Sequence, residues 1–128
     1  MELNEVKQIY WINKEISMYR RELEKITYLK GQGSDGQPKS SGNGDMTAEL
    51  AMEQKKYHDL IADAEYRRQL QKNKVLVFIS TIEDSLMRQI IFYRDISNLP
   101  WEIVAQEIGG STTPDSVRKA HQRFFRKK

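Results

Sequence analysis

The sequence predicts an all-α protein, with a long N-terminal helical hairpin or coiled coil followed by a compact C-terminal helix-turn-helix domain. Three observations predict this class. Apolar residues make up only 38% of the 128 residues and charged residues 30%, which favours long amphipathic helices over a buried sheet. Apolar side chains recur at alternating spacings of three and four through two long segments. Residues 83–128 then switch to short apolar runs separated by turn residues.

The segment 1–30 is predicted to form a coiled-coil helix. Its apolar side chains alternate three and four residues apart, and Glu, Lys and Arg fill most positions between them. Leu3 and Val6 lie outside this register, so we expect them to fray or to pack elsewhere. The seam consists of Ile9, Ile12, Ile16, Tyr19, Leu23 and Ile26.

The segment 31–45, GQGSDGQPKSSGNGD, is predicted to be a flexible Gly/Ser linker. It holds five of the seven glycines and no apolar side chain, so nothing in it offsets the entropy of ordering its backbone. Its length suits an antiparallel hairpin of the two flanking helices. It suits a tether between independent helices equally well.

The segment 46–82 is predicted to form a second long helix, with Asp45 as its N-cap. Two polar residues weaken its seam midway. A hairpin within one chain or a dimeric coiled coil would bury both seams, and neither helix would be stable alone. The second seam consists of Tyr57, Ile61, Ala64, Arg68, Gln71, Val75, Phe78 and Ile82.

The C-terminal domain begins with two predicted short helices, over 85–94 and 101–108. Pro100 fits the first turn of the second helix, where its missing N–H costs nothing, and Asn98 or Leu99 would precede it as the cap. The side chains expected on the buried faces are Leu86, Ile90 and Tyr93 on the first helix, and Trp101, Val104, Ala105 and Ile108 on the second.

A last helix is predicted over 114–125, after a turn at Gly109 and Gly110. Gly109 should supply the positive φ that ends the preceding helix, and Thr112 or Thr113 should cap the last one. A helix, a glycine-containing turn and a second helix together match the helix-turn-helix pattern. The packed face is expected to contain Val117, Ala120 and Phe124, with Phe125 at its edge and His121 in a structural role.

Positive charge is concentrated at the end of the sequence. Residues 114–128 contain six basic side chains and one acidic one, a local charge of +5, while the rest of the chain carries −2. A basic block of this kind indicates a polyanionic partner, with nucleic acid as the first candidate. Composition alone leaves a solvated tail, or a small three-helix domain with an ordinary charged surface, as the alternatives.

The segment 86–125 resembles region four of bacterial sigma factors, which reads the −35 promoter element. The resemblance is carried by W-E-x-V-A-x-E-I-G at 101–109 and by S-V-R at 116–118. The whole layout is similar to small phage-encoded transcription regulators of the ArpU/RinA type. The resemblance implies that helix 114–125 docks in the DNA major groove. Two differences stand out: the turn at 110–113 is two residues longer than usual, and a complete sigma factor is excluded because no promoter-melting region is present.

The outward face of helix 114–125 supplies the predicted DNA contacts. The N-terminal half of a recognition helix usually points at the base edges, and the remaining cations grip phosphates. We expect base contacts from Thr113, Asp115, Ser116, Lys119 and Gln122, and phosphate contacts from Arg118, Arg123, Arg126 and the terminal lysines.

The predicted function is sequence-specific binding of double-stranded DNA by a transcription regulator. Because one recognition helix binds weakly, we expect the helical arm to form a homodimer or to dock on RNA polymerase. A phage DNA-packaging component resembling a small terminase subunit is one alternative, since such proteins combine a helix-turn-helix with helical oligomerisation. A helical protein-binding adaptor without a DNA role is the other.

Several classes of function and location are not expected. The chain has no Cys and only two His, at 58 and 121, so we expect neither a metal site nor a cofactor. It shows no Gly-rich phosphate loop and no clustered carboxylates, which argues against an enzyme. No run of 18 apolar residues is present and the start MELNEVKQ lacks a signal-peptide stretch. We therefore expect a cytoplasmic protein without membrane partners, associated with the bacterial nucleoid when bound to DNA.

Overall fold

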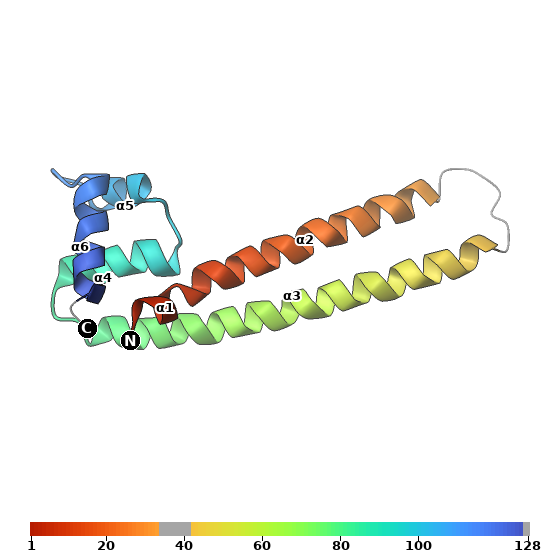
Figure 1. Cartoon of the computed structure of the whole chain (residues 1–128), viewed down its shortest axis with the longest axis horizontal. Helices are drawn as coiled ribbons and strands as arrows, with labels where there is room; N and C mark the ends of the chain where they lie inside the picture. The colour runs from red at the N-terminus through yellow and green to blue at the C-terminus, as the bar shows by residue number, and fades with distance from the viewer. Residues whose placement is uncertain (34–41, 127–128) are drawn as a thin grey trace. The chain divides into compact units, whose positions relative to one another are not determined.

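All regular structure in the described part of the chain is helical, which confirms the all-α class (Figure 1). The computed structural model describes residues 1–33 and 42–126, and the side chains of 1–29 and 47–126. In chain order the elements are α1 (Leu3–Val6), α2 (Gln8–Gly33), α3 (Gly42–Ser80), α4 (Ser85–Ile91), the π-helix η1 (Phe92–Ile96), α5 (Trp101–Ile108) and α6 (Pro114–Arg126).

Internal contacts divide the chain into two compact units. The first unit consists of Met1–Trp11 and Arg68–Lys128, and the second unit consists of Ile12–Arg67. The first unit therefore includes more than the predicted domain 83–128, because the first eleven residues and the last part of α3 pack with it.

In the second unit, α2 and α3 run antiparallel. Three pairs of side chains hydrogen-bond between the helices: Glu15 with Arg67, Arg20 with Glu65, and Thr27 with Gln54. From one pair to the next, the residue number of the α2 partner rises while that of the α3 partner falls, so the two helices run in opposite directions. The apolar seam between the helices contains buried Ile12, Ile16, Ile61 and Ala64, with Tyr19 and Leu23 packed against them.

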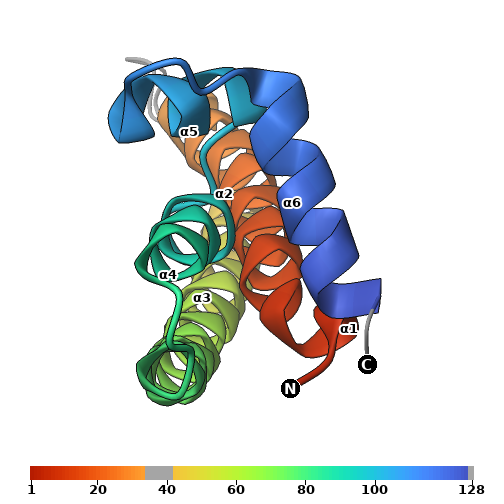
Figure 2. The same cartoon turned by 90° about the vertical axis from the view of Figure 1, so that its left-hand side faces the viewer.

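The core of the first unit brings the start of the chain together with its last helices. Val6 is fully buried there, so this residue packs outside the coiled-coil register and does not fray. Figure 2 shows α1 beside the C-terminal end of α6, where Val6 and Phe125 belong to one apolar cluster. The buried members of this cluster are Val6, Ile9, Val75, Ile82, Met87, Ile90, Ile91, Val104, Ala105, Val117 and Phe125.

One of the polar residues that interrupt the second seam has a definite partner. The Gln71 side-chain amide donates a hydrogen bond of 2.7 Å to the carbonyl oxygen of Glu5. Glu5 lies in the last turn of α1, where its carbonyl oxygen also receives the N–H of the capping residue Lys7. The helix predicted over 1–30 is in fact interrupted at Lys7, and Gln71 bonds to the backbone beside that interruption.

The buried face of α4 differs from the prediction. Leu86 is 46% exposed, while Met87, Ile90 and Ile91 are buried. Asp84 begins this helix by accepting a hydrogen bond of 3.0 Å from the Leu86 N–H. The predicted helix 85–94 also changes to a π-helix at Phe92. The Ser97 N–H donates to the Phe92 carbonyl five residues earlier, at 3.0 Å.

The remaining differences lie at helix ends. Pro100 is itself the N-cap of α5, with φ −64° and ψ 156°, so neither Asn98 nor Leu99 takes that place. Asp45 lies inside α3 and does not cap it, because that helix already begins at Gly42. The same helix ends at Ser80, two residues before the predicted end. Both long helices thus extend into the predicted linker 31–45. Residues 34–41 of that linker lie outside the described residues.

The last helix buries its second phenylalanine more than its first. Phe125 is buried and Phe124 is half-buried, the reverse of the expected order. The buried side chains of α6 follow a strict four-residue spacing from Val117 through His121 to Phe125.

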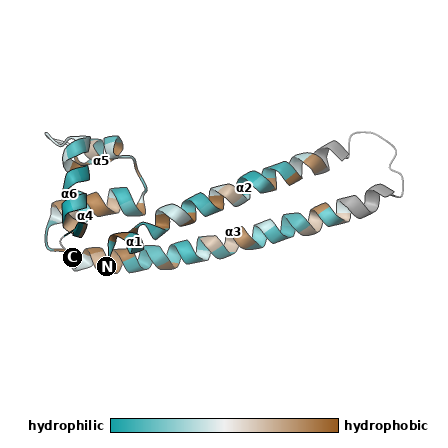
Figure 3. Ribbon diagram, viewed as in Figure 1, coloured by the Kyte–Doolittle hydropathy of each residue, from teal (hydrophilic) through white to brown (hydrophobic). Residues whose placement is uncertain are grey.

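None of the described helices is long and apolar enough to cross a membrane. Figure 3 shows hydrophilic and hydrophobic residues interspersed along α2 and α3.

The exposed Leu86 and the buried Ile90 provide a test of this core. We expect Ile90→Ala to lower the free energy of unfolding by about 2–5 kcal/mol, because it leaves a cavity where the side chain is fully buried. We expect Leu86→Ala, one turn earlier on α4, to change it by about 0.5 kcal/mol or less. Urea unfolding of both variants measures the difference, and equal losses would contradict this assignment of the buried face.

Candidate nucleic-acid interface

A reciprocal cap fixes the start of α6. The Ser116 N–H donates to the Thr113 hydroxyl oxygen at 3.1 Å, and the Thr113 N–H donates to the Ser116 hydroxyl oxygen at 3.1 Å. Two backbone donors at the helix start are satisfied in this way, as in a capping box. Of the two predicted caps, Thr113 is therefore the one that the structure selects.

A glycine turn separates α5 from α6. Gly109 has φ 81° and Gly110 has φ 66°, a region that side-chain-bearing residues rarely adopt. The Gly109 N–H donates to the Ala105 carbonyl at 2.9 Å and closes the end of α5. The predicted positive φ at Gly109 is confirmed. Beyond the turn, Val117 of α6 joins Val104 and Ala105 of α5 in the core.

The eight predicted DNA contacts all lie on the exposed side of α6 or at its start. The side chains of Val117, His121 and Phe125 occupy the opposite, buried side. Their separation follows from helical geometry, since residues four apart share a face. Exposure is what the predicted contacts require, and their role in DNA binding stays a prediction. The exposed residues are Thr113, Asp115, Ser116, Arg118, Lys119, Gln122, Arg123 and Arg126.

Asp115 holds two of the four cations on this face. Its carboxylate lies 2.5 Å from the Arg118 guanidinium and 3.0 Å from the Lys119 ammonium. The hydrogen bonds from Arg118 and then Lys119 lower the pKa of the Asp115 carboxyl. Asp115 is therefore ionised at neutral pH, and its charge partly neutralises both cations. Arg123 and Arg126 lie in the last turn of the helix, where its dipole favours cations.

A buried hydrogen bond anchors α6 to η1. His121 Nε2 lies 2.7 Å from a carboxylate oxygen of Asp95, and the two residues are 5% and 6% exposed. His121 was expected to have a structural role, but its partner Asp95 was not predicted from the sequence. Nothing in the local sequence indicates that Asp95 is buried. The π-helix that turns it toward α6 is visible only in the structure.

Aromatic and cationic groups surround this buried pair. The Trp101 ring meets the His121 ring nearly at right angles, with 5.2 Å between the ring centres. The Trp101 ring also contacts Arg94, whose guanidinium carbon lies 4.4 Å from the centre of the ring. Arg94 also donates a hydrogen bond of 3.1 Å to the Leu99 carbonyl, which fixes the guanidinium in place.

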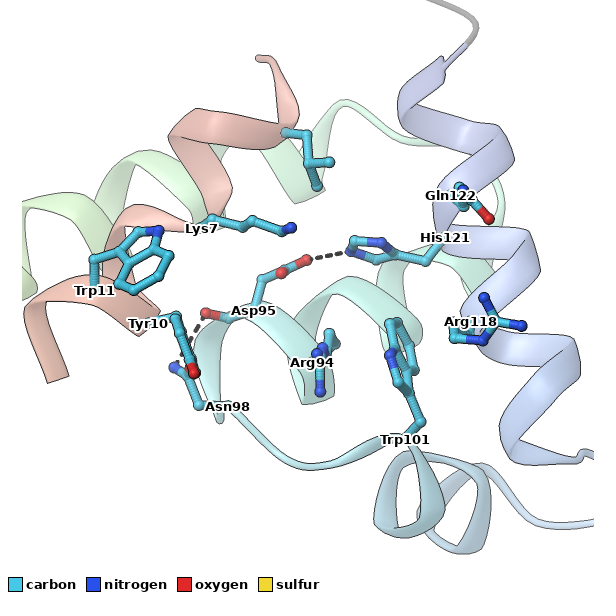
Figure 4. A pocket seen from close by; sticks show the side chains of 11 residues that line it. Lys7, Tyr10, Trp11, Arg94, Asp95, Asn98, Trp101, Arg118, His121 and Gln122 are labelled. Carbon is cyan, nitrogen blue, oxygen red and sulfur yellow. Dashed lines mark hydrogen bonds and ion pairs between the residues drawn. The ribbon is translucent and has the colours of Figure 1, made fainter. Parts of the chain in front are cut away.

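A cleft opens above the buried pair (Figure 4), and its volume is about 490 Å³. All of its lining residues belong to the first unit. Arg118 and Gln122 of the predicted DNA-contacting face form part of its wall, so cleft and face adjoin. The lining consists of Leu3, Lys7, Tyr10, Trp11, Arg94, Asp95, Asn98, Trp101, Arg118, His121 and Gln122.

Comparisons with protein-family models, with curated protein sequences and with solved structures found no match to this chain. Among the residues whose positions are described, no group of three or more His, Asp or Glu side chains is arranged to hold a metal ion.

Replacing Asp95 tests whether the buried pair anchors α6. We expect Asp95→Ala to lower the free energy of unfolding by about 1–3 kcal/mol, because it leaves the buried His121 ring nitrogen without a partner. Asp95→Asn should cost less, since an amide still offers a hydrogen-bonding group. A double-mutant cycle with His121→Ala should show a coupling of about 0.5–3 kcal/mol. Additive losses in urea unfolding would rule out the anchoring role.

Proposed function

We propose that this chain is a DNA-binding transcription regulator that inserts α6 into the major groove. Its fold would then be a helical hairpin joined to a helix-turn-helix, in which α5 and α6 are the paired helices. One observation carries the proposal: α6 buries one side in the core, while its other side and the capping residue Thr113 expose four cations and three uncharged polar side chains against one carboxylate. A face of this composition suits a negatively charged, hydrogen-bonding duplex.

The dimensions of α6 support the proposal. Its 13 residues span about 20 Å, and the major groove is wide enough to admit one helix. The longer turn 110–113 does not disturb the start of the helix, because the Thr113–Ser116 cap closes it. The resemblance to sigma factor region four gives the same docking helix and suggests a transcriptional rather than a structural role.

The capping bonds sharpen the choice of base-reading residues. The Ser116 hydroxyl donates to the Thr113 carbonyl at 2.9 Å and accepts from the Thr113 N–H, so most of its hydrogen-bonding capacity is already used. Asp115 is engaged with two cations. Gln122 is therefore the best candidate for a base contact, while Arg118, Lys119, Arg123 and Arg126 suit phosphates.

A second attachment would raise the affinity of a single recognition helix. Several large apolar side chains of the second unit are exposed, and they offer a surface for a second copy of the chain or for RNA polymerase. These side chains include Met18, Tyr28, Met52, Leu60 and Tyr66.

Removing two cations from α6 tests the proposal directly. We expect Lys119→Ala/Arg123→Ala to weaken binding to a duplex of arbitrary sequence. It should also lower the dependence of log K on log salt by about two from a starting slope of roughly −4 to −5, because two fewer phosphates are neutralised. Fluorescence anisotropy at several salt concentrations measures both. The matched control is Arg20→Ala/Lys55→Ala, which removes two exposed cations from the second unit.

Two outcomes would favour the other classes. Unchanged DNA retention in Lys119→Ala/Arg123→Ala at low salt would favour a protein-binding adaptor. A ring of eight or more subunits in solution would favour a packaging component, whereas a monomer or dimer fits a regulator. Genome-wide selection of bound fragments followed by footprinting would then locate the site, and a regulator should protect DNA that adjoins a promoter.

Asp115 offers a test with the opposite sign. We expect Asp115→Asn to strengthen binding to the same duplex several-fold and to steepen the salt dependence by about one, because Arg118 and Lys119 lose their competing carboxylate. The control Asp59→Asn makes the same change beside Lys55 on α3 and should leave DNA binding unchanged. Weaker binding by Asp115→Asn would instead mean that its carboxylate contacts a base.

A further inference from the structure

The cleft beside α6 contains charged groups that the proposed DNA contact does not use. Lys7 comes from the junction of α1 and α2, and Arg94 comes from η1. Figure 4 shows the Lys7 side chain extending across the cleft toward Asp95. With Arg118 of α6, three cations line a space that contains one carboxylate, and that carboxylate is already bonded to His121. Arg118 is also paired with Asp115 outside the cleft, so Lys7 and Arg94 supply most of the positive charge. This excess of positive charge favours an anionic occupant.

Aromatic rings make up much of the remaining wall. Trp11 is 57% exposed and meets Tyr10 edge to face, with 5.0 Å between the ring centres. Trp101 lines the cleft as well, with the Arg94 guanidinium against its ring. Aromatic faces and stacked guanidinium groups both provide partners for a flat ring. An ion such as sulfate would fill only a small part of the space and would leave these rings unused.

We propose that the cleft binds a small anion that carries a planar ring, of the nucleotide class. Its phosphate would lie among Lys7, Arg94 and Arg118, and its base would stack on the exposed aromatic rings. The volume of about 490 Å³ falls within the range of roughly 300–1,000 Å³ that is usual for small-molecule sites. Aromatic stacking combined with cations is the chemistry by which proteins hold unpaired nucleotides.

The cleft shares two side chains with the DNA-contacting face, which gives the ligand a regulatory effect. Arg118 and Gln122 line the cleft, and both are proposed to contact DNA. A guanidinium that holds a ligand phosphate is not available to a phosphate of the duplex. This step rests on the proposed function: a bound nucleotide lowers the affinity of α6 for DNA.

The two tryptophans of the chain allow a direct binding test without DNA. Both Trp11 and Trp101 line the cleft, so tryptophan fluorescence of the full chain reports on this site alone. Adenosine and guanosine 5′-monophosphates are the probes, with adenosine and inorganic phosphate as fragments that carry only the ring or only the charge. We expect a saturable change with at least one nucleotide and much weaker effects of both fragments.

The variant Lys7→Gln tests the position of the phosphate. Lys7 is exposed, so its replacement leaves the core intact, and we expect nucleotide affinity to fall about tenfold. Lys7→Arg should retain most of the affinity. The control Lys74→Gln removes an exposed lysine of the same unit that does not line the cleft, and it should bind as the parent chain does.

Three results would overturn the site. The first is no fluorescence change with either nucleotide, the second is that adenosine or inorganic phosphate alone binds as tightly as the nucleotide, and the third is an unchanged nucleotide affinity in Lys7→Gln.

The regulatory effect has its own measurement. At a nucleotide concentration ten times its dissociation constant, the apparent dissociation constant for duplex DNA should rise several-fold, up to the limit of about elevenfold for two ligands that exclude each other completely. An unchanged value contradicts the shared use of Arg118. If the chain binds nucleotide but no DNA at low salt, the proposed function fails while the site stands.

Discussion

The contact between Asp95 and His121 determines which side of α6 reaches solvent. A carboxylate and an imidazole are costly to bury apart, so their hydrogen bond fixes the rotation of α6 about its own axis. Val117 and Phe125, four residues to either side of His121, then face the core, and the cationic side chains between them must face outward. The same pair forms the floor of the cleft. The exposed face of α6 and the cleft thus both depend on one buried polar contact.

Much of the fold was predictable because helical periodicity and turn chemistry are local properties. The spacing of Ile12, Ile16 and Ile61 predicted that these side chains lie on apolar seams, and the bounds of α5 agree with the prediction residue for residue. Whether the seams meet within one chain or between two chains was left open by the sequence. Gly109 and Thr113 fill places that only a few residue types can take. The exposed face of α6 followed from the same reasoning, since its charged residues share one side of a helical wheel.

The missed features depend on contacts between residues far apart in the sequence. Asp95 appears in the sequence as one more polar residue before a turn, and only its pairing with His121, 26 residues later, explains its burial. The π-helix that positions it has no sequence pattern of its own. Lys7, Tyr10 and Trp11 lie more than 80 residues before Arg94 in the chain, so no local pattern associates them with the cleft. In the sequence, Gln71 is a polar residue that interrupts an apolar seam, yet in the structure its side chain donates a hydrogen bond to a carbonyl of α1.

The composition of the first unit also constrains how the protein is made. Val6 and Ile9, in the first eleven residues, share a core with Val117 and Phe125. During synthesis on the ribosome these early residues are exposed before their partners exist, because α6 follows them by more than 100 residues. The antiparallel contacts of α2 and α3 lie closer together in sequence and become available sooner. Folding of the first unit therefore completes only after α6 has emerged, with the α2–α3 pair as the earlier folding step.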